Sequence, residues 1–479
     1  MIVYKFGGAL ARTKRGMEAL VRLTVEAYQK ETARAKRKGH ATQSNGLVLV
    51  VSAIGHTTRH LARAAELAEH GNLIEAEQVL DRTVNQHEVL AEQLGLTEAT
   101  SERFYTITTQ VRSLLEGIAI VRELSPRTRD AVIAAGEDFA AALIVALLED
   151  RELPVRFVDA RHIIITDENH GNAARLPDET THSVRQRVLP RLNRHEIVLT
   201  QGFVGATRDG ITTTMGTESS DLTATLLAGA LAASEVVIWK SLPGLYTADP
   251  EIVPNAKLIR SLSFDEAEEM GRRGARILFP SFAHPLLASE SKTILRVATP
   301  FGRMGRHTVL QHVLPPPARL SPQKALALAT HQRLLLVHLR ERTSGGARGS
   351  AEPNGMPRSR QRVESSTSNL LHNPILMWST PMERIVLIHK EDRASFLREI
   401  EAAKAVEISA EHSVAAISLV IRKPTTNPAD SRFAAGIARS LRGFHTHAIL
   451  PFEQSLLAIV DEGEAVAAMR KLHHDLFEV

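Results

Sequence analysis

The chain of 479 residues contains no cysteine, few aromatic residues (4%) and little net charge for its length. Without cysteine it cannot form a disulfide bond, a cysteine-ligated zinc or iron–sulfur site, or a thiol nucleophile. Scarce aromatic side chains disfavour a surface that stacks nucleic-acid bases, and a formal net charge of +4 gives no electrostatic reason for such a partner. We therefore expect no nucleic-acid partner.

The sequence also has little that suggests a membrane or export. We find no uninterrupted apolar run near the roughly 20 residues that cross a bilayer. The first residues, MIVYKFGG, lack the basic and then apolar pattern of a signal peptide. We expect a cytoplasmic protein without a membrane partner, and at roughly 150 residues per domain its length allows about three domains.

Short apolar segments alternate with long helical patterns from Met1 to about Arg296. The expected strands are Met1–Lys5, Leu47–Val51, Val155–Val158, Glu196–Leu199 and Glu235–Trp239. The expected helical stretches are Gly16–Lys38, Leu61–Leu94, Ser101–Val121 and Arg127–Glu149. This alternation predicts an α/β fold with a mainly parallel sheet.

Composition changes at the proline-rich segment Leu314–Pro317, which is a stiff spacer. We expect a first domain over 1–313, a linker over 314–323 and a second region over 324–479, in which short strands and helices form two small α+β modules. From Thr343 to Asn369, 12 of 27 residues are Gly, Ser or Pro, which predicts a disordered insert at about 343–369.

Four loops that follow expected strands carry residues suited to phosphate chemistry. The quoted segments are Lys5-Phe6-Gly7-Gly8, Ser52-Ala53 with Thr58, Gly202-Phe203 with Ser220-Asp221, and Trp239-Lys240-Ser241 continuing to Asp249-Pro250. Glycine lets backbone N–H groups approach an anion closely, and a lysine adds a point charge. In an open α/β sheet, ligands bind at the carboxyl ends of strands. Each loop alone also fits an ordinary turn or helix cap, so the prediction rests on their combination.

Taken together, these segments resemble the aspartokinases of the amino-acid-kinase family over almost the whole chain. Further shared segments are Leu124–Arg129, Gly136-Glu137, Thr213-Thr214 with Gly216, and Gly244 with Tyr246–Pro250. The resemblance implies a three-layer α/β sandwich of amino-acid-kinase type over 1–313, and tandem ACT-like regulatory modules over 324–479. It also implies a homodimer formed through those modules.

The resemblance further implies transfer of a phosphoryl group from ATP, with Mg²⁺, to the side-chain carboxylate of L-aspartate. The product, 4-phospho-L-aspartate, begins lysine, threonine and methionine biosynthesis. Lys5, between the phosphates, and Asp221, organising the lysine and metal, would be catalytic, and the protein alone would fix no metal. Substrate-binding positions would be Ser52, Thr58, Glu137 (which would pair with the α-ammonium group), Phe203, Thr217 and Ser220. Nucleotide-binding positions would be Lys5, Gly7, Gly8, Lys240, Ser241, Tyr246, Asp249 and Arg276.

The sequence differs from the family pattern at several of these positions. The family's Gly-Arg-Gly-Gly-Ser-Asp reads Gly216-Thr217-Glu218-Ser219-Ser220-Asp221, which loses a fork-shaped cation and adds an acid. Ala9, Lys240 and Glu251 are further differences. A second interpretation is therefore open: a catalytically weak or inactive protein of this fold that binds a ligand or a partner subunit, or a kinase for another amino acid.

Two histidines near the carboxyl terminus could suggest a metal site. His445-Thr446-His447 places two imidazoles on one face of a strand. Because no carboxylate pattern lies nearby in the sequence, we interpret them as surface histidines.

Overall fold

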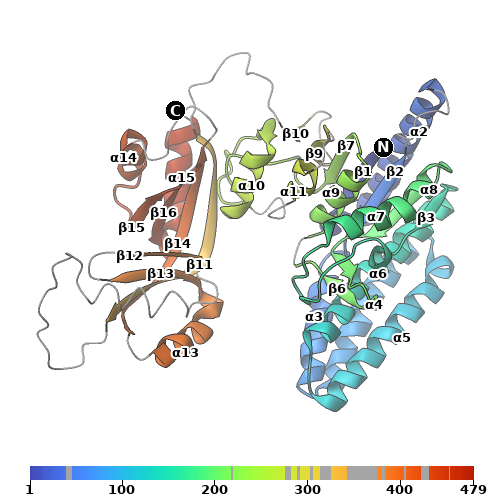
Figure 1. The fold of residues 1–479 in the computed structure, drawn as a ribbon, viewed down its shortest axis with the longest axis horizontal. Coiled ribbons are helices and arrows are strands. Elements are labelled where there is room, and N and C mark those ends of the chain that lie inside the picture. Colours follow the sequence, from blue (N-terminus) through green and yellow to red (C-terminus); the bar gives the residue numbers. More distant parts are fainter. Residues whose placement is uncertain are drawn as a thin grey trace, which may run out of the picture. The chain divides into compact units, whose positions relative to one another are not determined.

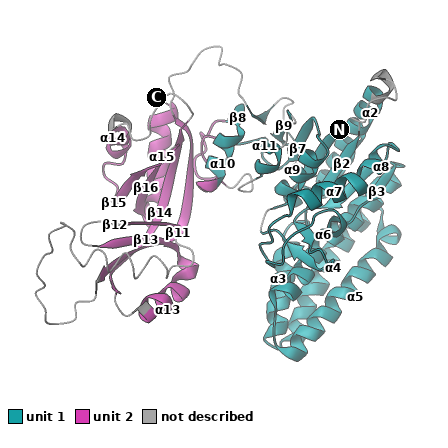
Figure 2. Cartoon of the chain, viewed as in Figure 1, with its two compact units in different colours: residues 1–245, 258–271, 276–318 teal, residues 246–257, 272–275, 319–479 magenta. Residues whose placement is uncertain are grey.

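The computed structural model describes residues 1–38, 46–216, 219–275, 282–288, 292–301, 306–312, 325–341, 375–379, 383–403, 406–421, 431–452 and 454–478. The chain forms two units: residues 1–245, 258–271 and 276–318 in the first, and residues 246–257, 272–275 and 319–479 in the second (Figure 2). The domain limits expected from the sequence stay predictions. The expected insert at 343–369 lies outside the described residues.

Eight strands form the sheet of the first unit, in the order β3-β4-β2-β1-β7-β9-β10-β8. Their bounds are β1 Ile2–Phe6, β2 Leu47–Val51, β3 Val155–Phe157, β4 Ile197–Gln201, β7 Glu235–Trp239, β8 Ser261–Ser263, β9 Ile294–Ala298 and β10 His307–Gln311. Neighbours run parallel except β9 and β10, which are antiparallel. The expected mainly parallel sheet is confirmed, and β5 (Val204–Ala206) and β6 (Thr212–Thr214) add a small hairpin.

Helices cover both faces of this sheet (Figure 1). The helices of this unit are α1 Gly8–Ala11, α2 Lys14–Lys38, α3 Thr57–Glu69, α4 Leu73–Leu94, α5 Thr97–Val121, α6 Pro126–Asp150, α7 Pro177–Arg187, α8 Leu189–Leu192, α9 Ser220–Ala230, α10 Phe264–Arg272 and α11 His284–Leu287. Side chains alternate along β1: Ile2 and Phe6 join the core that includes residues of α2 to α6. Lys5 has the opposite parity, and it contacts Asp221 of α9. Strand periodicity thus places Lys5 on the face that α9 covers.

The helical pattern over Leu61–Leu94 forms two helices. α3 ends at Glu69 and α4 begins at Leu73. Gly71 lies between them with a φ of +79°, a left-handed conformation that glycine adopts readily. The expectation of one continuous helical stretch is therefore corrected at Gly71.

α6 is long and apolar enough to cross a bilayer by length and composition, although Glu137 and Asp138 interrupt its apolar run. In the structure, 78% of its most apolar window is buried. A single helix of this kind is weak evidence for a membrane span, because the core helix of a globular unit passes the same test. We interpret α6 as the core helix that carries site residues to the edge of the sheet.

The second unit contains an antiparallel sheet of six strands in the order β12-β13-β11-β14-β16-β15. The strands are β11 Ala325–Glu341, β12 Leu376–Ser379, β13 Arg384–His389, β14 Val406–Ile421, β15 Thr446–Pro451 and β16 Ser455–Asp461. The helices α13 Arg393–Ala403, α14 Ser431–Ser440 and α15 Ala465–His473 accompany it. β13 pairs with the second half of β11, and β16 pairs with the second half of β14. The expected α+β character is confirmed, and the two modules share the long strands β11 and β14.

Candidate active site

A cavity of about 720 Å³ lies at the carboxyl edge of the sheet in the first unit. The strands β4, β2, β1 and β7 are neighbours there, so the loops that follow them meet. The strand order reverses at β1, which has β2 on one side and β7 on the other. Ligands bind outside the strand ends at such a reversal. The fold therefore brings the four loops expected from the sequence to one cavity.

A buried carboxylate that contacts two lysines lines the cavity. Lys5 Nζ lies 2.9 Å from Asp221 Oδ1, and Lys240 Nζ donates to Asp221 Oδ2 at 2.9 Å. Burial by itself would raise the pKa of Asp221, but the ammonium groups of Lys240 and Lys5 hold it below its usual value. Two ammonium groups on one carboxylate leave an excess positive charge, which suits a polyphosphate.

The backbone is tightly fitted around these lysines. A Cβ atom on Gly8 would lie 1.9 Å from the carbonyl oxygen of Ala53, so only glycine fits there. Gly7 N–H donates to the carbonyl oxygen of Trp239 at 3.1 Å, which ties the end of β1 to the end of β7. This hydrogen bond occupies the Gly7 N–H in the structure, and the expected role of Gly7 in nucleotide binding stays a prediction.

Among the described residues that line this cavity, Ser52 Oγ and Glu137 Oε2 are buried and have neither a hydrogen-bond partner nor an ion pair. The other carboxylate oxygen of Glu137 accepts a hydrogen bond from Ala53 N–H at 3.2 Å. Burial raises the pKa of Glu137 to about 8. Buried polar groups are nearly always satisfied, so these two atoms are candidates for binding a polar ligand.

Asp130 is a site residue that the sequence analysis missed. It is fully buried, and its oxygens accept hydrogen bonds from His170 Nδ1 (2.9 Å), Gly171 N–H (3.0 Å), Thr214 N–H (3.1 Å) and Thr214 Oγ1 (2.6 Å). These bonds join α6 to β6 and to the loop at 170–171 beside the cavity. A sequence signal existed, because Asp130 lies seven residues before Glu137 and so on nearly the same face of α6.

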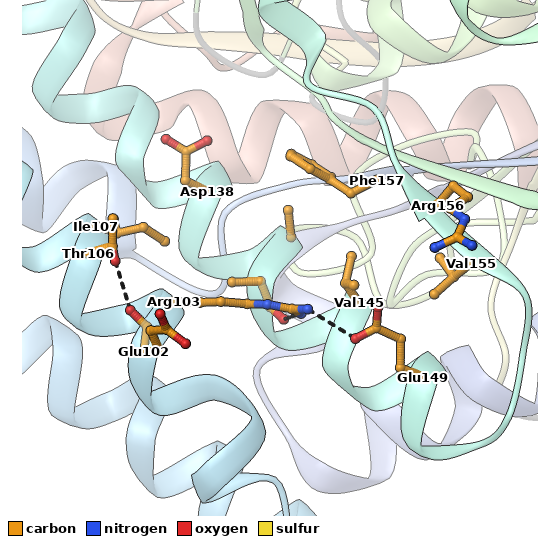
Figure 3. A pocket seen from close by; sticks show the side chains of 12 residues that line it. Glu102, Arg103, Thr106, Ile107, Asp138, Val145, Glu149, Val155, Arg156 and Phe157 are labelled. Carbon is orange, nitrogen blue, oxygen red and sulfur yellow. Dashed lines mark hydrogen bonds and ion pairs between the residues drawn. The ribbon is translucent and has the colours of Figure 1, made fainter.

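A second cavity, of about 590 Å³, is lined by α5, α6 and β3 (Figure 3). Arg103 donates to Glu149 at 3.1 Å, and Asp138 accepts hydrogen bonds from Arg161 at 2.9 and 3.0 Å. Glu137 and Asp138 are adjacent in α6, and one lines each cavity. Because no motif loop lines the second cavity, the first is the candidate active site.

Comparison with known proteins agrees with this geometry. A sequence profile of the "Amino acid kinase family" matches residues 1–296. Lysine-sensitive aspartokinase 3 of Escherichia coli is 33% identical over 297 residues, which span 62% of this chain and 64% of that protein. The aspartokinase of Chlamydia trachomatis is 30% identical over 336 residues, which span 70% of each chain. The chain belongs to the amino acid kinase family, in its aspartokinase branch.

Solved structures extend this similarity to the second unit. The crystal structure of E. coli aspartokinase III with aspartate and ADP superposes with a TM-score of 0.78, at 25% identity and with 100% of both chains covered. The lysine and aspartate complex of the same enzyme gives a TM-score of 0.72. The aspartokinase fold class inferred from the motifs is therefore confirmed.

In this chain, the structure brings together most of the site residues expected from the sequence. Those that line the cavity are Lys5, Gly7, Gly8, Ser52, Thr58, Glu137, Phe203, Ser220, Asp221, Lys240 and Ser241. Phe203 has a φ of +67°, a conformation rare for a bulky residue and often associated with functional sites. Tyr246 and Asp249 belong to the second unit, and Thr217 and Arg276 lie outside the described residues. The roles of all these residues stay predictions.

The raised pKa of Glu137 predicts a pH-dependent cost of folding. Between its ordinary value of 4.5 and about 8, the folded protein keeps a proton that the unfolded chain releases, so wild-type stability falls as pH rises. Glu137→Gln removes this titration. We expect the variant's free energy of unfolding, relative to wild type, to increase from pH 5 to pH 8 in urea titrations without ligand. Glu116→Gln, at an exposed position of α5, is the control. If the difference in free energy of unfolding between Glu137→Gln and wild type stays constant from pH 5 to pH 8, the raised pKa of Glu137 is contradicted.

Proposed function

We propose that the protein is a cytoplasmic aspartate kinase that transfers the γ-phosphoryl group of ATP to the side-chain carboxylate of L-aspartate, producing 4-phospho-L-aspartate. The observation that carries the proposal is one cavity with two lysines at Asp221 and two orphaned polar atoms on Ser52 and Glu137. Similarity to aspartokinases supports the same reaction. The product would enter lysine, threonine and methionine biosynthesis.

The two lysines at Asp221 suit the triphosphate. Phosphoryl transfer is catalysed mainly by positioning the reactants and stabilising the charge that spreads over the transferred group. Lys5 is at the end of a buried strand and Asp221 fixes its ammonium group, so the cation needs little reorganisation when charge develops. We assign Lys5 to the transferring phosphoryl group and Lys240 to a neighbouring phosphate.

Glu137 and Ser52, which line the same cavity, suit an amino acid. The orphaned oxygen of Glu137 would accept the α-ammonium group of aspartate, which would favour the ionised carboxylate and so lower the pKa of Glu137 when substrate binds. Ser52 Oγ can donate a hydrogen bond to a substrate carboxylate. Arg59 and Arg129 also line the cavity, and they are the cations that could meet the carboxylates.

The residues present fit a magnesium ion that is bound mostly by the nucleotide. Mg²⁺ commonly uses one or two carboxylates together with substrate phosphates. Asp221 is the carboxylate at the two lysines, and both of its oxygens already contact ammonium groups. The phosphates would therefore supply most of the ligands, and the bound ion would neutralise part of their charge.

Replacing Lys5 tests the proposed reaction. Lys5→Met keeps most of the buried aliphatic stem and removes the charge, so we expect a loss of at least about a hundredfold in turnover with an intact fold. Turnover is measured by trapping the acyl phosphate with hydroxylamine in the presence of ATP, Mg²⁺ and aspartate. Circular dichroism checks the fold, and Lys14→Ala, at the exposed start of α2, is the control. A wild-type rate in Lys5→Met would reject the assignment.

The loop before Ser220 predicts weak binding of aspartate. The arginine expected from the family pattern is Thr217 here, and Glu218 adds a negative charge. A charge-assisted hydrogen bond contributes about 1.5–3 kcal/mol, or roughly ten- to a hundredfold in affinity. We expect the double change Thr217→Arg and Glu218→Gly to lower the KM for aspartate by about tenfold or more.

Two outcomes of that experiment are informative. If the wild type saturates at low micromolar aspartate, another cation, such as Lys240, Arg129 or Arg276, binds the aspartate carboxylate in place of the expected arginine. No gain from the double change, together with no turnover on any amino acid, would favour the alternative of a kinase-fold protein that binds a ligand or partner subunit.

We also propose that the chain forms a homodimer through its ACT-like modules. In the described sheet of the second unit, β12 and β15 are edge strands, and edges of this kind promote association. Light scattering at micromolar concentration should give twice the chain mass of 52.5 kDa. A particle of the single-chain mass under these conditions would exclude the dimer.

A further inference from the structure

A histidine and aspartate cluster lies at the end of β15 and β16 in the second unit. His447 Nε2 lies 2.7 Å from Asp461 Oδ1, and His445 Nδ1 lies 3.0 Å from Asp461 Oδ2. Asp461 follows His447 by 14 residues, so the interpretation of these histidines as plain surface residues missed their carboxylate. One carboxylate thus joins two imidazoles.

The backbone holds the cluster in place. The register of β15 against β16 shifts between Thr446 and Ala448, which makes His447 the extra residue of a bulge. Asp461 N–H donates to the carbonyl oxygen of His445 at 3.2 Å. The N–H of His445 donates to Glu464 Oε2 at 2.6 Å. Bulges often direct side chains at functional sites, and here three side chains converge on a fixed backbone.

One of the three side chains is nearly buried and the other two are more exposed, so an ion could reach them from solvent. The side chain of His447 is 9% exposed, whereas those of His445 and Asp461 are 65% and 42% exposed. His447 therefore provides a fixed ligand position, and His445 can rotate and leaves a path for solvent. His412 of β14 is the next imidazole, with its ring centre 5.0 Å from that of His447.

We propose that His445, His447 and Asp461 form a binding site for a divalent transition-metal ion such as Zn²⁺, with solvent or His412 completing the coordination. Two imidazoles and a carboxylate are a donor set that zinc prefers. Among the described residues, they are the only group of three such side chains whose ligand atoms lie within 4.8 Å of one another.

Binding an ion requires the side chains to move, because the ligand atoms of the three residues lie within 4.8 Å of one another and not at tetrahedral spacing. In a tetrahedral site with bonds of roughly 2.0–2.1 Å, neighbouring ligand atoms lie about 3.3 Å apart. The two present contacts, at 2.7 and 3.0 Å, must open by roughly half an ångström. The ion would replace the hydrogen bonds between the imidazoles and Asp461, and would fasten the edge strand β15 to the end of β16.

The test is a metal titration of the full chain, purified without a polyhistidine tag and stripped with a chelator that is then removed. Zn²⁺ is titrated in competition with a chromophoric chelator, and Co²⁺ is titrated in parallel to record its visible absorption. We expect one ion per chain for the wild type. His447→Ala and Asp461→Asn should each weaken binding by at least about tenfold and abolish the cobalt spectrum.

Two further variants keep the test decisive. His445→Ala changes a mostly exposed side chain, so it should fold normally and still lose binding. His474→Ala is the matched control, because His474 also lies beside a carboxylate, at 3.6 Å from Glu478, but outside the cluster. Absence of one-to-one binding in the wild type, or equal loss of binding in His474→Ala, would overturn the proposal and leave a hydrogen-bonded cluster only.

Discussion

The pairing of Asp221 with both Lys5 and Lys240 is the interaction on which the candidate active site depends. A buried charge is costly without a partner, and here one carboxylate stabilises two ammonium groups at 2.9 Å. The arrangement requires β1 and β7 to pair in parallel, with Phe6 opposite Trp239. It also requires α9 to begin above the ends of both strands. The register of β1 against β7 therefore also fixes where the two lysines lie relative to Asp221.

The lysines and Glu137 give the cavity two polar regions of different character. The lysines give an excess positive charge at Asp221, whereas Glu137 contributes a buried carboxyl group whose pKa is raised to about 8 by burial. The core helix α6 positions Glu137, and Asp130 of the same helix is held by hydrogen bonds from the neighbouring loop and β6. Under the proposed function, the phosphates of ATP would bind at the lysines and the α-ammonium group of aspartate at Glu137.

Two long strands connect the two modules of the second unit. β11 and β14 each extend through both halves of the sheet. The cluster at His445, His447 and Asp461 lies where the last two strands of this sheet pair. All three residues belong to the second unit, whereas the residues that line the candidate active site belong to the first, so metal binding and phosphoryl transfer can be tested with separate variants.

The sequence by itself indicated five of the eight strands in the first sheet and eleven of the residues that line its cavity. Leu47–Val51 is a continuous apolar run because the strand is buried on both faces, and the lysine, glycine and hydroxyl residues after such strands identify the ligand-binding edge. Only the tertiary structure decided that Lys240 shares Asp221 with Lys5, that Asp130 supports the site, and that Asp461 meets His445 and His447. Local patterns record periodicity and turn preference, whereas contacts between distant residues depend on strand order and register, which no local pattern contains.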